Sequence, residues 1–369
     1  MDLRKYIKTD ADLQEAIKFI TDGTLFYQPF IIHDNIVMGE ARNFVKQYSD
    51  VNSIYDYNLY AKGFPELEKI NGIKRNLITD EEKDFFIKIN KEYDYLYDYF
   101  IDEIIKEVNE PIENLTFAEI GSNTGIALLK LCEKGAKKCY AYDWTNYKPL
   151  YNWYRKILGA NIDFLQCGWD NLYHRILVRN NVAVTLQSIE IFSRKILKKE
   201  KPHQRHYYAF EQIFSKRDKH LKTYDIPEVD VMLNTVFTNH QFDPMQFIAY
   251  CCDRSRKAVF FWLLLDKSNS DDHTLWFPES SPHENIITSE NKKFPLNYNN
   301  NVRISEKLLK NTLEQCGFEN IKKIIPDVSE DFYNWGVGKS NNAKTEKSWA
   351  LIIGTRTSDK KSAFYKNSF

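Results

Sequence analysis

The chain contains 369 residues, of which 43% are hydrophobic and 15% aromatic, so it can bury a sizeable core, and its length predicts about two domains. Its 51 basic and 51 acidic residues cancel, which argues against a protein built mainly to hold a nucleic acid backbone. The sequence has no run of 18 apolar residues and no apolar signal core near its start, so we expect no membrane contact and a cytoplasmic location. The six cysteines show no Cys-x-x-Cys spacing, which predicts reduced, mostly buried thiols and no metal site.

Residues 1–110 lack the regular alternation of strands and helices found later in the chain, and we predict a mainly helical N-terminal or lid domain there. Two short apolar runs within residues 26–39, separated by the turn pair Asp34-Asn35, predict a small hairpin ahead of the longer helices. The helix predicted at 79–108 begins with an acidic turn and carries an aromatic stripe. Such a stripe is typical of a packed core; a substrate-binding surface is the alternative. Helices are predicted at 10–21, 39–48 and 79–108.

Residues 115–125 are the most informative stretch, because an apolar run ending in Glu119 leads directly into a turn that contains Gly121 and Gly125. Helix-forming residues follow, and the free amides of their first turn can face a carboxylate or another polar ligand group. The next predicted strand ends at Asp143, 22 positions after Gly121. A carboxylate at that distance is placed to accept both ribose hydroxyls of an adenosine.

The pattern Glu119-x-Gly121-x-x-x-Gly125, followed by Asp143, resembles the first two motifs of the class I S-adenosylmethionine (SAM) dependent methyltransferases. A dinucleotide-binding turn needs Gly-x-Gly-x-x-Gly, and Asn123 stands where its second glycine would approach the pyrophosphate, so a dehydrogenase is disfavoured. The alternative is a βαβ unit whose glycines serve only the turn. The resemblance implies an α/β, Rossmann-like fold with a seven-stranded methyltransferase sheet, helices on both faces, and SAM as cofactor.

The rest of the chain continues the strand and helix alternation, and we assign residues 111–355 to this catalytic domain. A helix is predicted at 304–316, and residues 356–369 are predicted to be a loose tail. An insertion at about 175–225 separates the third and fourth strands. The strands are predicted within 115–120 and at 138–142, 162–166, 229–233, 258–265, 321–325 and 349–354.

The resemblance also implies which residues hold the cofactor. The glycine turn supplies backbone and polar contacts, the second strand supplies a carboxylate, the third strand is followed by residues that frame the adenine, and the fourth strand ends beside the methyl donor. If the N-terminal hairpin closes over SAM, Tyr27 and Gln28 are lid candidates; otherwise they serve packing. The implied cofactor residues are Glu119, Gly121, Ser122, Asn123, Thr124, Gly125, Asp143, Trp144, Cys167, Gly168, Trp169, Asn234 and Thr235.

His240 is the candidate general base, because it follows the fourth strand and an unperturbed histidine titrates near neutral pH. Its alternative role is to pack or cap the turn before Asp243 and Pro244. The sequence predicts a SAM-dependent methyltransferase whose acceptor is a small molecule, such as a sugar, a nucleotide-linked metabolite or a secondary metabolite. An RNA methyltransferase is the alternative enzyme, since residues 193–222 are strongly basic, and a catalytically silent SAM-fold binding module is the third hypothesis. The atom that is methylated and the oligomeric state are left open.

Overall fold

The computed structural model places its described helices and strands in one compact unit, formed by residues 1–166, 228–279 and 301–369. The second unit, residues 167–227 and 280–300, includes only Ile226 and Pro227 among the described residues. The insertion at 175–225 and the tail beyond Arg356 therefore lie outside the described part of the chain. That part comprises residues 1–40 except 23, 25 and 27, and residues 57–69, 75–143, 146–166, 226–235, 237–240, 244–266, 275–276, 303–327 and 349–356.

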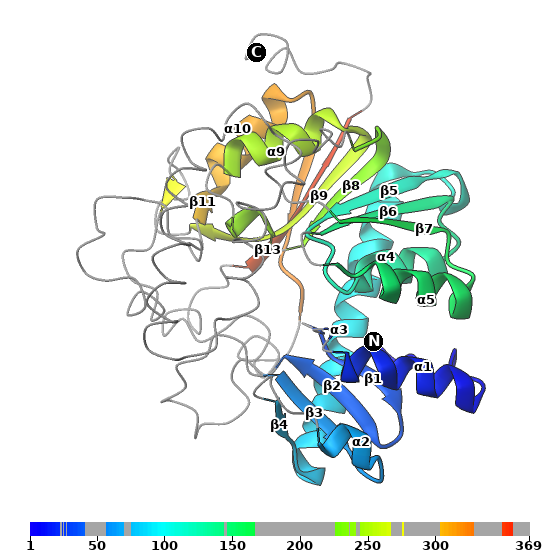
Figure 1. Ribbon diagram of the computed structural model, residues 1–369. Helices are drawn as coiled ribbons and strands as arrows, with labels where there is room; N and C mark the ends of the chain where they lie inside the picture. Colours follow the sequence, from blue (N-terminus) through cyan, green and yellow to red (C-terminus); the bar gives the residue numbers. More distant parts are fainter. Residues whose placement is uncertain are drawn as a thin grey trace, which may run out of the picture. The chain divides into compact units, whose positions relative to one another are not determined.

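A mainly parallel sheet forms the centre of the larger unit, with strands in the order β7, β6, β5, β8, β9, β13 and β12 (Figure 1). The strands from β7 to β9 pair in parallel, whereas β13 runs antiparallel to both β9 and β12. All seven strands predicted from the sequence are present. They are β5 (Thr116–Ile120), β6 (Lys138–Asp143), β7 (Ile162–Gln166), β8 (Val229–Thr235), β9 (Ser255–Asp266), β12 (Asn320–Ile324) and β13 (Trp349–Thr355).

A short strand pair that the sequence analysis did not predict extends this sheet. Strand β11 (Arg303–Ser305) lies parallel to the carboxyl end of β9, with Ile304 opposite Leu265, and β10 (Leu275–Trp276) pairs antiparallel with β11. Each strand has only two or three residues, and so short a segment cannot show the alternating hydrophobic pattern of a strand.

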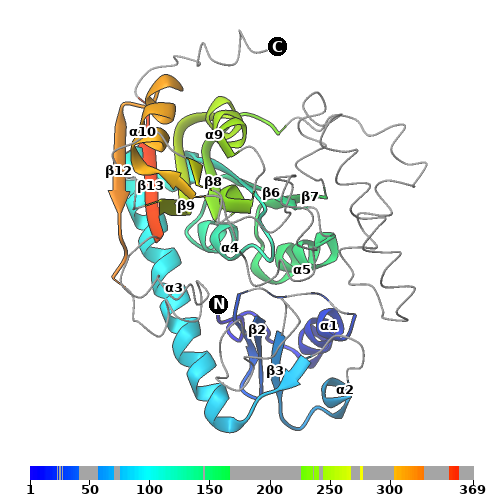
Figure 2. The same ribbon diagram turned by 90° about the vertical axis from the view of Figure 1, so that its left-hand side faces the viewer.

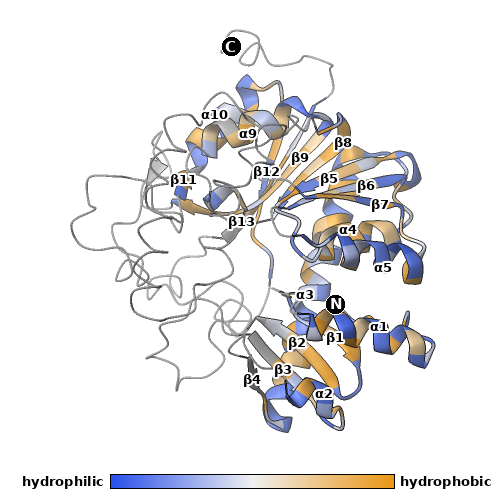
Figure 3. Ribbon diagram, viewed as in Figure 1, coloured by the Kyte–Doolittle hydropathy of each residue, from blue (hydrophilic) through white to orange (hydrophobic). Residues whose placement is uncertain are grey.

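Helices cover both faces of the sheet, as predicted. Strands β8 and β9 are apolar along most of their length because neither face meets water (Figure 3). From β5 the chain adds β6 and β7 toward one edge of the sheet. After β7 it crosses to β8, on the other side of β5, and adds β9 toward the other edge, so right-handed crossovers place the two sets of helices on opposite faces (Figure 1). The helices are α4 (Ile126–Glu133) and α5 (Lys148–Leu158) on one face, and α9 (Pro244–Asp253) and α10 (Glu306–Gln315) on the other.

The N-terminal region contains the predicted helices at both ends but has a larger sheet than predicted. The hairpin is present as β1 and β2, and two further strands extend it to a four-stranded sheet in the order β1, β2, β3, β4. Gly39 and Glu40, predicted to begin a helix, lie in β2 instead; residues 41–48 of that predicted helix lie outside the described residues. The elements are α1 (Asp10–Thr21), β1 (Phe30–His33), β2 (Ile36–Glu40), β3 (Tyr57–Ala61), α2 (Pro65–Glu68), β4 (Arg75–Leu77) and α3 (Asp80–Val108).

Helix α3 connects the small N-terminal sheet to the large sheet (Figure 2). It begins with a capping box, in which the Thr79 hydroxyl and the Glu82 carboxylate satisfy amides of the first turn. Its aromatic stripe is buried, and the Phe100 ring lies 5.3 Å from that of Phe260 and 5.0 Å from that of Trp262, both in β9. The core interpretation of the stripe is therefore confirmed.

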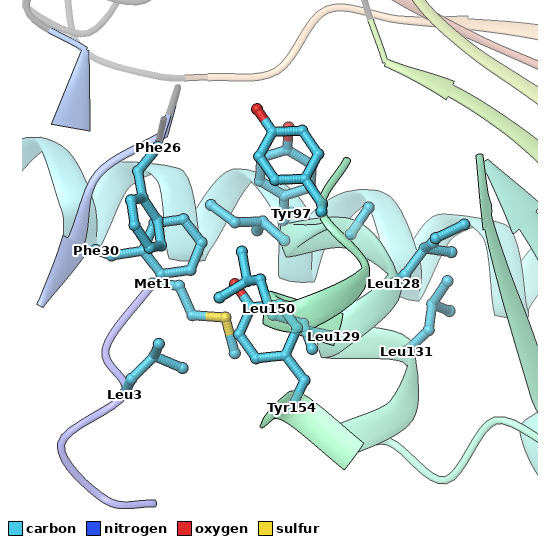
Figure 4. Packing of buried hydrophobic residues seen from close by; sticks show 14 of the residues in the cluster. Met1, Leu3, Phe26, Phe30, Tyr97, Leu128, Leu129, Leu131, Leu150 and Tyr154 are labelled. Carbon is cyan, nitrogen blue, oxygen red and sulfur yellow. The ribbon is translucent and has the colours of Figure 1, made fainter. Parts of the chain in front are cut away.

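The N-terminal region and the large sheet share one hydrophobic core. Figure 4 shows Met1, Phe26 and Phe30 beside Leu150 and Tyr154 of α5, and all five side chains are almost fully buried. Among the residues that the structure describes, no helix combines the length and the apolar character needed to cross a bilayer.

Candidate functional site

The predicted glycine turn lies at the carboxyl edge of the sheet, where the chain leaves β5. The connections that follow β5 and β8 go to opposite faces of the sheet, so the strand order reverses between these two strands. Such a switch point is the usual place for a ligand in an open α/β sheet. The turn uses left-handed backbone at Gly121 (φ 74°), Asn123 (φ 54°) and Gly125 (φ 82°). The amides of Gly121 and Ser122 donate to the carbonyl of Tyr142 at 2.8 and 3.0 Å, so the turn is fixed to the end of β6.

The two glycines are required by packing as well as by backbone conformation. A Cβ at Gly121 would lie 2.7 Å from the ring of Phe237, and a Cβ at Gly125 would overlap the Tyr151 hydroxyl. Each glycine therefore has a structural reason that needs no ligand. The chemical case for a ligand site has to come from the polar groups around the turn.

Asp143 faces the turn as its spacing predicted. Its Oδ2 accepts the amide of Asn123 at 2.8 Å, and the residue is 6% exposed. The left-handed conformation of Asn123 turns this amide toward the carboxylate. The second-strand carboxylate thus lies beside the glycine turn.

Three tyrosines, one immediately before α5 and two within it, form hydrogen bonds with the turn. The sequence analysis did not identify them. Tyr147 donates to Asn123 Oδ1 at 3.0 Å, Tyr151 contacts Ser122 Oγ and the Asn123 carbonyl at 3.1 Å, and Tyr154 donates to the Thr124 carbonyl at 3.1 Å. Their spacing of four and three residues puts them on one helical face, and that spacing is the signal that could have revealed them.

Glu119 is the most unusual group at this edge. It is 1% exposed; its Oε1 accepts the Thr235 hydroxyl at 2.5 Å, and its Oε2 has no hydrogen-bond partner among the described residues. Burial raises the pKa of Glu119 from its ordinary value of 4.5 to about 8; the Thr235 hydrogen bond opposes this shift and the charge of Asp143 adds to it. A buried carboxyl with an unpaired oxygen is costly unless a donor reaches it.

Asn234 and its neighbours fix the segment that follows β8. Asn234 donates to the Ile120 carbonyl at 3.2 Å and accepts the Thr238 amide at 2.9 Å. Asn239 pairs with both backbone groups of Leu264 in β9, at 3.1 and 2.9 Å. These bonds secure the short helix η3 (Phe237–His240) between β8 and β9.

The structure brings together most of the predicted cofactor residues, from Glu119 through the glycine turn to Asp143, Asn234 and Thr235. His240 is the last residue of η3, beyond the carboxyl end of β8, so its predicted place in the chain holds; its role as base stays a prediction. No group of metal-binding side chains occurs among the described residues, and four of the five cysteines described there are buried. Trp144, Cys167, Gly168, Trp169 and the lid candidate Tyr27 lie outside the described residues.

No protein-family model and no curated protein matches the sequence. Among solved structures, the chain is similar to magnesium protoporphyrin IX methyltransferase from Synechocystis PCC 6803 with bound S-adenosylhomocysteine, at 10% identity and a TM-score of 0.40, over 76% of this chain and 89% of that one. It is also similar to 1,6-didemethyltoxoflavin-N1-methyltransferase from Burkholderia thailandensis, at 9% identity and a TM-score of 0.34, over 90% of this chain and 100% of that one.

The chain's own topology defines its class of fold. Seven strands in the order given above, with β13 inserted antiparallel beside β9 after β12, form the Rossmann-like α/β sheet that the sequence resemblance implied. The glycine turn lies at the switch point of this sheet, and Asp143 at the end of β6 lies beside it.

The raised pKa of Glu119 predicts that this residue lowers stability as the pH rises. The folded protein binds the Glu119 proton more tightly than the unfolded chain, so the stability it contributes is complete below about pH 4.5 and is lost as the pH rises to about 8. Thermal unfolding of the parent and of Glu119→Gln, which cannot ionise, measures this difference. The melting temperature of the variant relative to the parent should rise across this range and level off above it; a constant difference would contradict the assignment.

The contact between Gly121 and Phe237 predicts a coupled effect on stability. Gly121→Ala forces an alanine into left-handed backbone, at a cost of about 1 to 2 kcal/mol, and adds the overlap with the ring. In the Phe237→Ala background only the backbone cost should remain. Urea unfolding of the parent, the two single variants and the double variant gives the backbone cost and the cost of the overlap separately. Equal costs of Gly121→Ala in the two backgrounds would show that the Phe237 ring does not oppose a side chain at position 121.

Proposed function

We propose that this protein is a SAM-dependent methyltransferase that transfers a methyl group to a small-molecule acceptor. The observation that supports SAM most directly is the unpaired Oε2 of Glu119, buried at the end of β5 beside the glycine turn. A cationic donor is what such an oxygen lacks, and the amino group of SAM is one.

The charges around the turn support the same ligand. Glu119 and Asp143 are both at least nine-tenths buried, and no lysine or arginine among the described residues forms an ion pair with Glu119. A ligand that brings positive charge to this edge relieves the cost of two buried carboxyl groups. SAM carries an ammonium and a sulfonium, and its ribose offers two hydroxyls to Asp143.

The neutral polar groups of the site suit methyl transfer. SAM supplies a methyl group already activated on sulfur, so the protein has mainly to align the acceptor with it and to exclude water. The tyrosine hydroxyls of α5 and the Asn234 amide hold the backbone around the turn without adding charge. His240, beyond the end of β8, is the residue we assign to take a proton from the acceptor where one has to leave.

The net charge of the whole chain is zero, and we propose the class of acceptor from it. A polyanionic acceptor would have to be held by the basic residues 193–222, all of which lie in the insertion outside the described part of the chain. We therefore favour a sugar, a nucleotide-linked metabolite or a secondary metabolite over RNA. The six cysteines without Cys-x-x-Cys spacing support a cytoplasmic location.

Replacing Asp143 by alanine should weaken SAM binding by about 1 to 3 kcal/mol, because two ribose hydroxyls lose their acceptor. The variant also loses the bond to the Asn123 amide, so Asp143→Asn, which keeps one carbonyl acceptor, is the matched control. Isothermal titration calorimetry with SAM measures both. Absence of binding by the parent, or equal affinity in parent and Asp143→Ala, would refute the cofactor assignment.

Incubating the protein with methyl-labelled SAM and a cell extract separates the three hypotheses. Label in the small-molecule fraction is expected. Label in RNA, with binding that weakens steeply as salt rises, would make the RNA methyltransferase the better reading. Binding of SAM with no transfer to either fraction would favour a silent module.

A further inference from the structure

Asn123 of the glycine turn is held at three different atoms by two elements of the fold. Tyr151 donates to its backbone carbonyl at 3.1 Å, and Tyr147 donates to its side-chain Oδ1 at 3.0 Å. Its own amide donates to Asp143 Oδ2 at 2.8 Å. The two tyrosines come from α5 and its N-cap and the carboxylate comes from the end of β6, so Asn123 connects these two elements.

The backbone of Asn123 explains why these partners matter. Its φ of 54° lies in the left-handed region, which residues other than glycine seldom adopt. In this conformation the amide reaches Asp143 while the carbonyl of the same residue reaches Tyr151. A residue keeps such a conformation only where its surroundings fix it, and the two hydrogen bonds from the tyrosines do so here.

The two tyrosine rings are themselves fixed by Phe164 of β7. The Tyr151 ring stacks on Phe164 with 4.8 Å between the centroids, and the Tyr147 ring meets it edge-on at 6.4 Å. Both tyrosines are at most 2% exposed, so bulk water cannot replace a lost hydroxyl. Gly125 leaves room for the Tyr151 hydroxyl, since a Cβ there would overlap it. The hydroxyls therefore reach Asn123 from a rigid support.

We propose that Tyr147 and Tyr151 are positioning residues for the ribose of the cofactor. They fix Asn123, and the Asn123 amide fixes the carboxylate of Asp143, to which the ribose hydroxyls are assigned. A carboxylate held at one oxygen is already oriented, whereas a rotating one has to be ordered when the ligand binds. This inference rests on the proposed function and adds that α5 sets how strongly the protein distinguishes ribose from deoxyribose.

Calorimetric titration of S-adenosylhomocysteine and of its 2′-deoxy analogue tests the role. The parent should prefer the ribose form by about tenfold, the effect of one hydrogen bond of about 1.4 kcal/mol. Tyr147→Phe and Tyr151→Phe keep the buried rings and should each reduce this preference to about threefold, because Asp143 is then less well oriented. Tyr154→Phe is the matched control: it loses a bond to Thr124 instead of Asn123 and should keep the preference of the parent, whatever its effect on the two affinities.

A measurement without ligand tests the same hydrogen bonds. In protein that carries isotope-labelled asparagine, the NMR signal of the Asn123 amide is identified by its loss in Asn123→Gly, which tolerates the left-handed backbone. A charge-assisted bond to a carboxylate draws an amide proton downfield, so the signal should move upfield in Tyr147→Phe and Tyr151→Phe. Tyr95→Phe removes the hydroxyl of a ring on α3 that is 52% exposed and should leave the signal unchanged.

The outcomes separate this inference from the proposed function. Full ribose preference in both tyrosine variants, or an unmoved Asn123 signal, overturns the positioning role and leaves the methyltransferase assignment intact. An equal loss of affinity for the two ligands also overturns it, because a general structural defect weakens both alike. A parent that binds the two ligands equally overturns it as well, since the ribose is then not recognised. A parent that binds neither ligand overturns the proposed function, and the inference with it.

Discussion

Burial of the Glu119 carboxyl at the end of β5 determines the chemistry available at this edge of the sheet. Water does not reach it, and a carboxyl in that position must stay protonated or find donors. The fold supplies one donor, from Thr235, and leaves Oε2 without another among the described residues. The same burial that weakens the folded protein at higher pH is therefore the property on which the proposed cofactor site depends.

The surroundings of that carboxyl are held by neutral hydrogen bonds rather than by ion pairs. Tyr151 and Tyr154 fix the glycine turn from α5, and Asn234 ties the end of β8 to the end of β5. Neutral hydrogen-bond donors fix the positions of the turn and of the end of β8 without cancelling the charge of the carboxylates. A reaction whose donor is already activated needs this kind of rigid alignment more than it needs acids and bases.

The N-terminal region is part of this arrangement and not an appendage to it. Helix α3 buries Phe100 against β9, and its Asp94 and Asp98 form ion pairs with Lys130 of α4 at 3.2 and 3.0 Å. The core is shared, and Gln28, ahead of β1, accepts the Thr124 hydroxyl of the glycine turn at 2.7 Å, so the N-terminal region contacts the turn directly.

The sequence by itself determined the seven strands, the helices at 10–21 and 79–108, and the glycine turn facing Asp143, because hydrophobic period, capping residues and glycine spacing are local properties. It did not determine the third and fourth strands of the N-terminal sheet, since β4 has three residues and its pairing with β3 joins segments distant in the chain. Only the tertiary structure decided that the tyrosines of α5 contact the glycine turn and that Gln28, one of the lid candidates, accepts from Thr124. These bonds join residues up to 96 positions apart, as between Gln28 and Thr124, and no local pattern records such a partner.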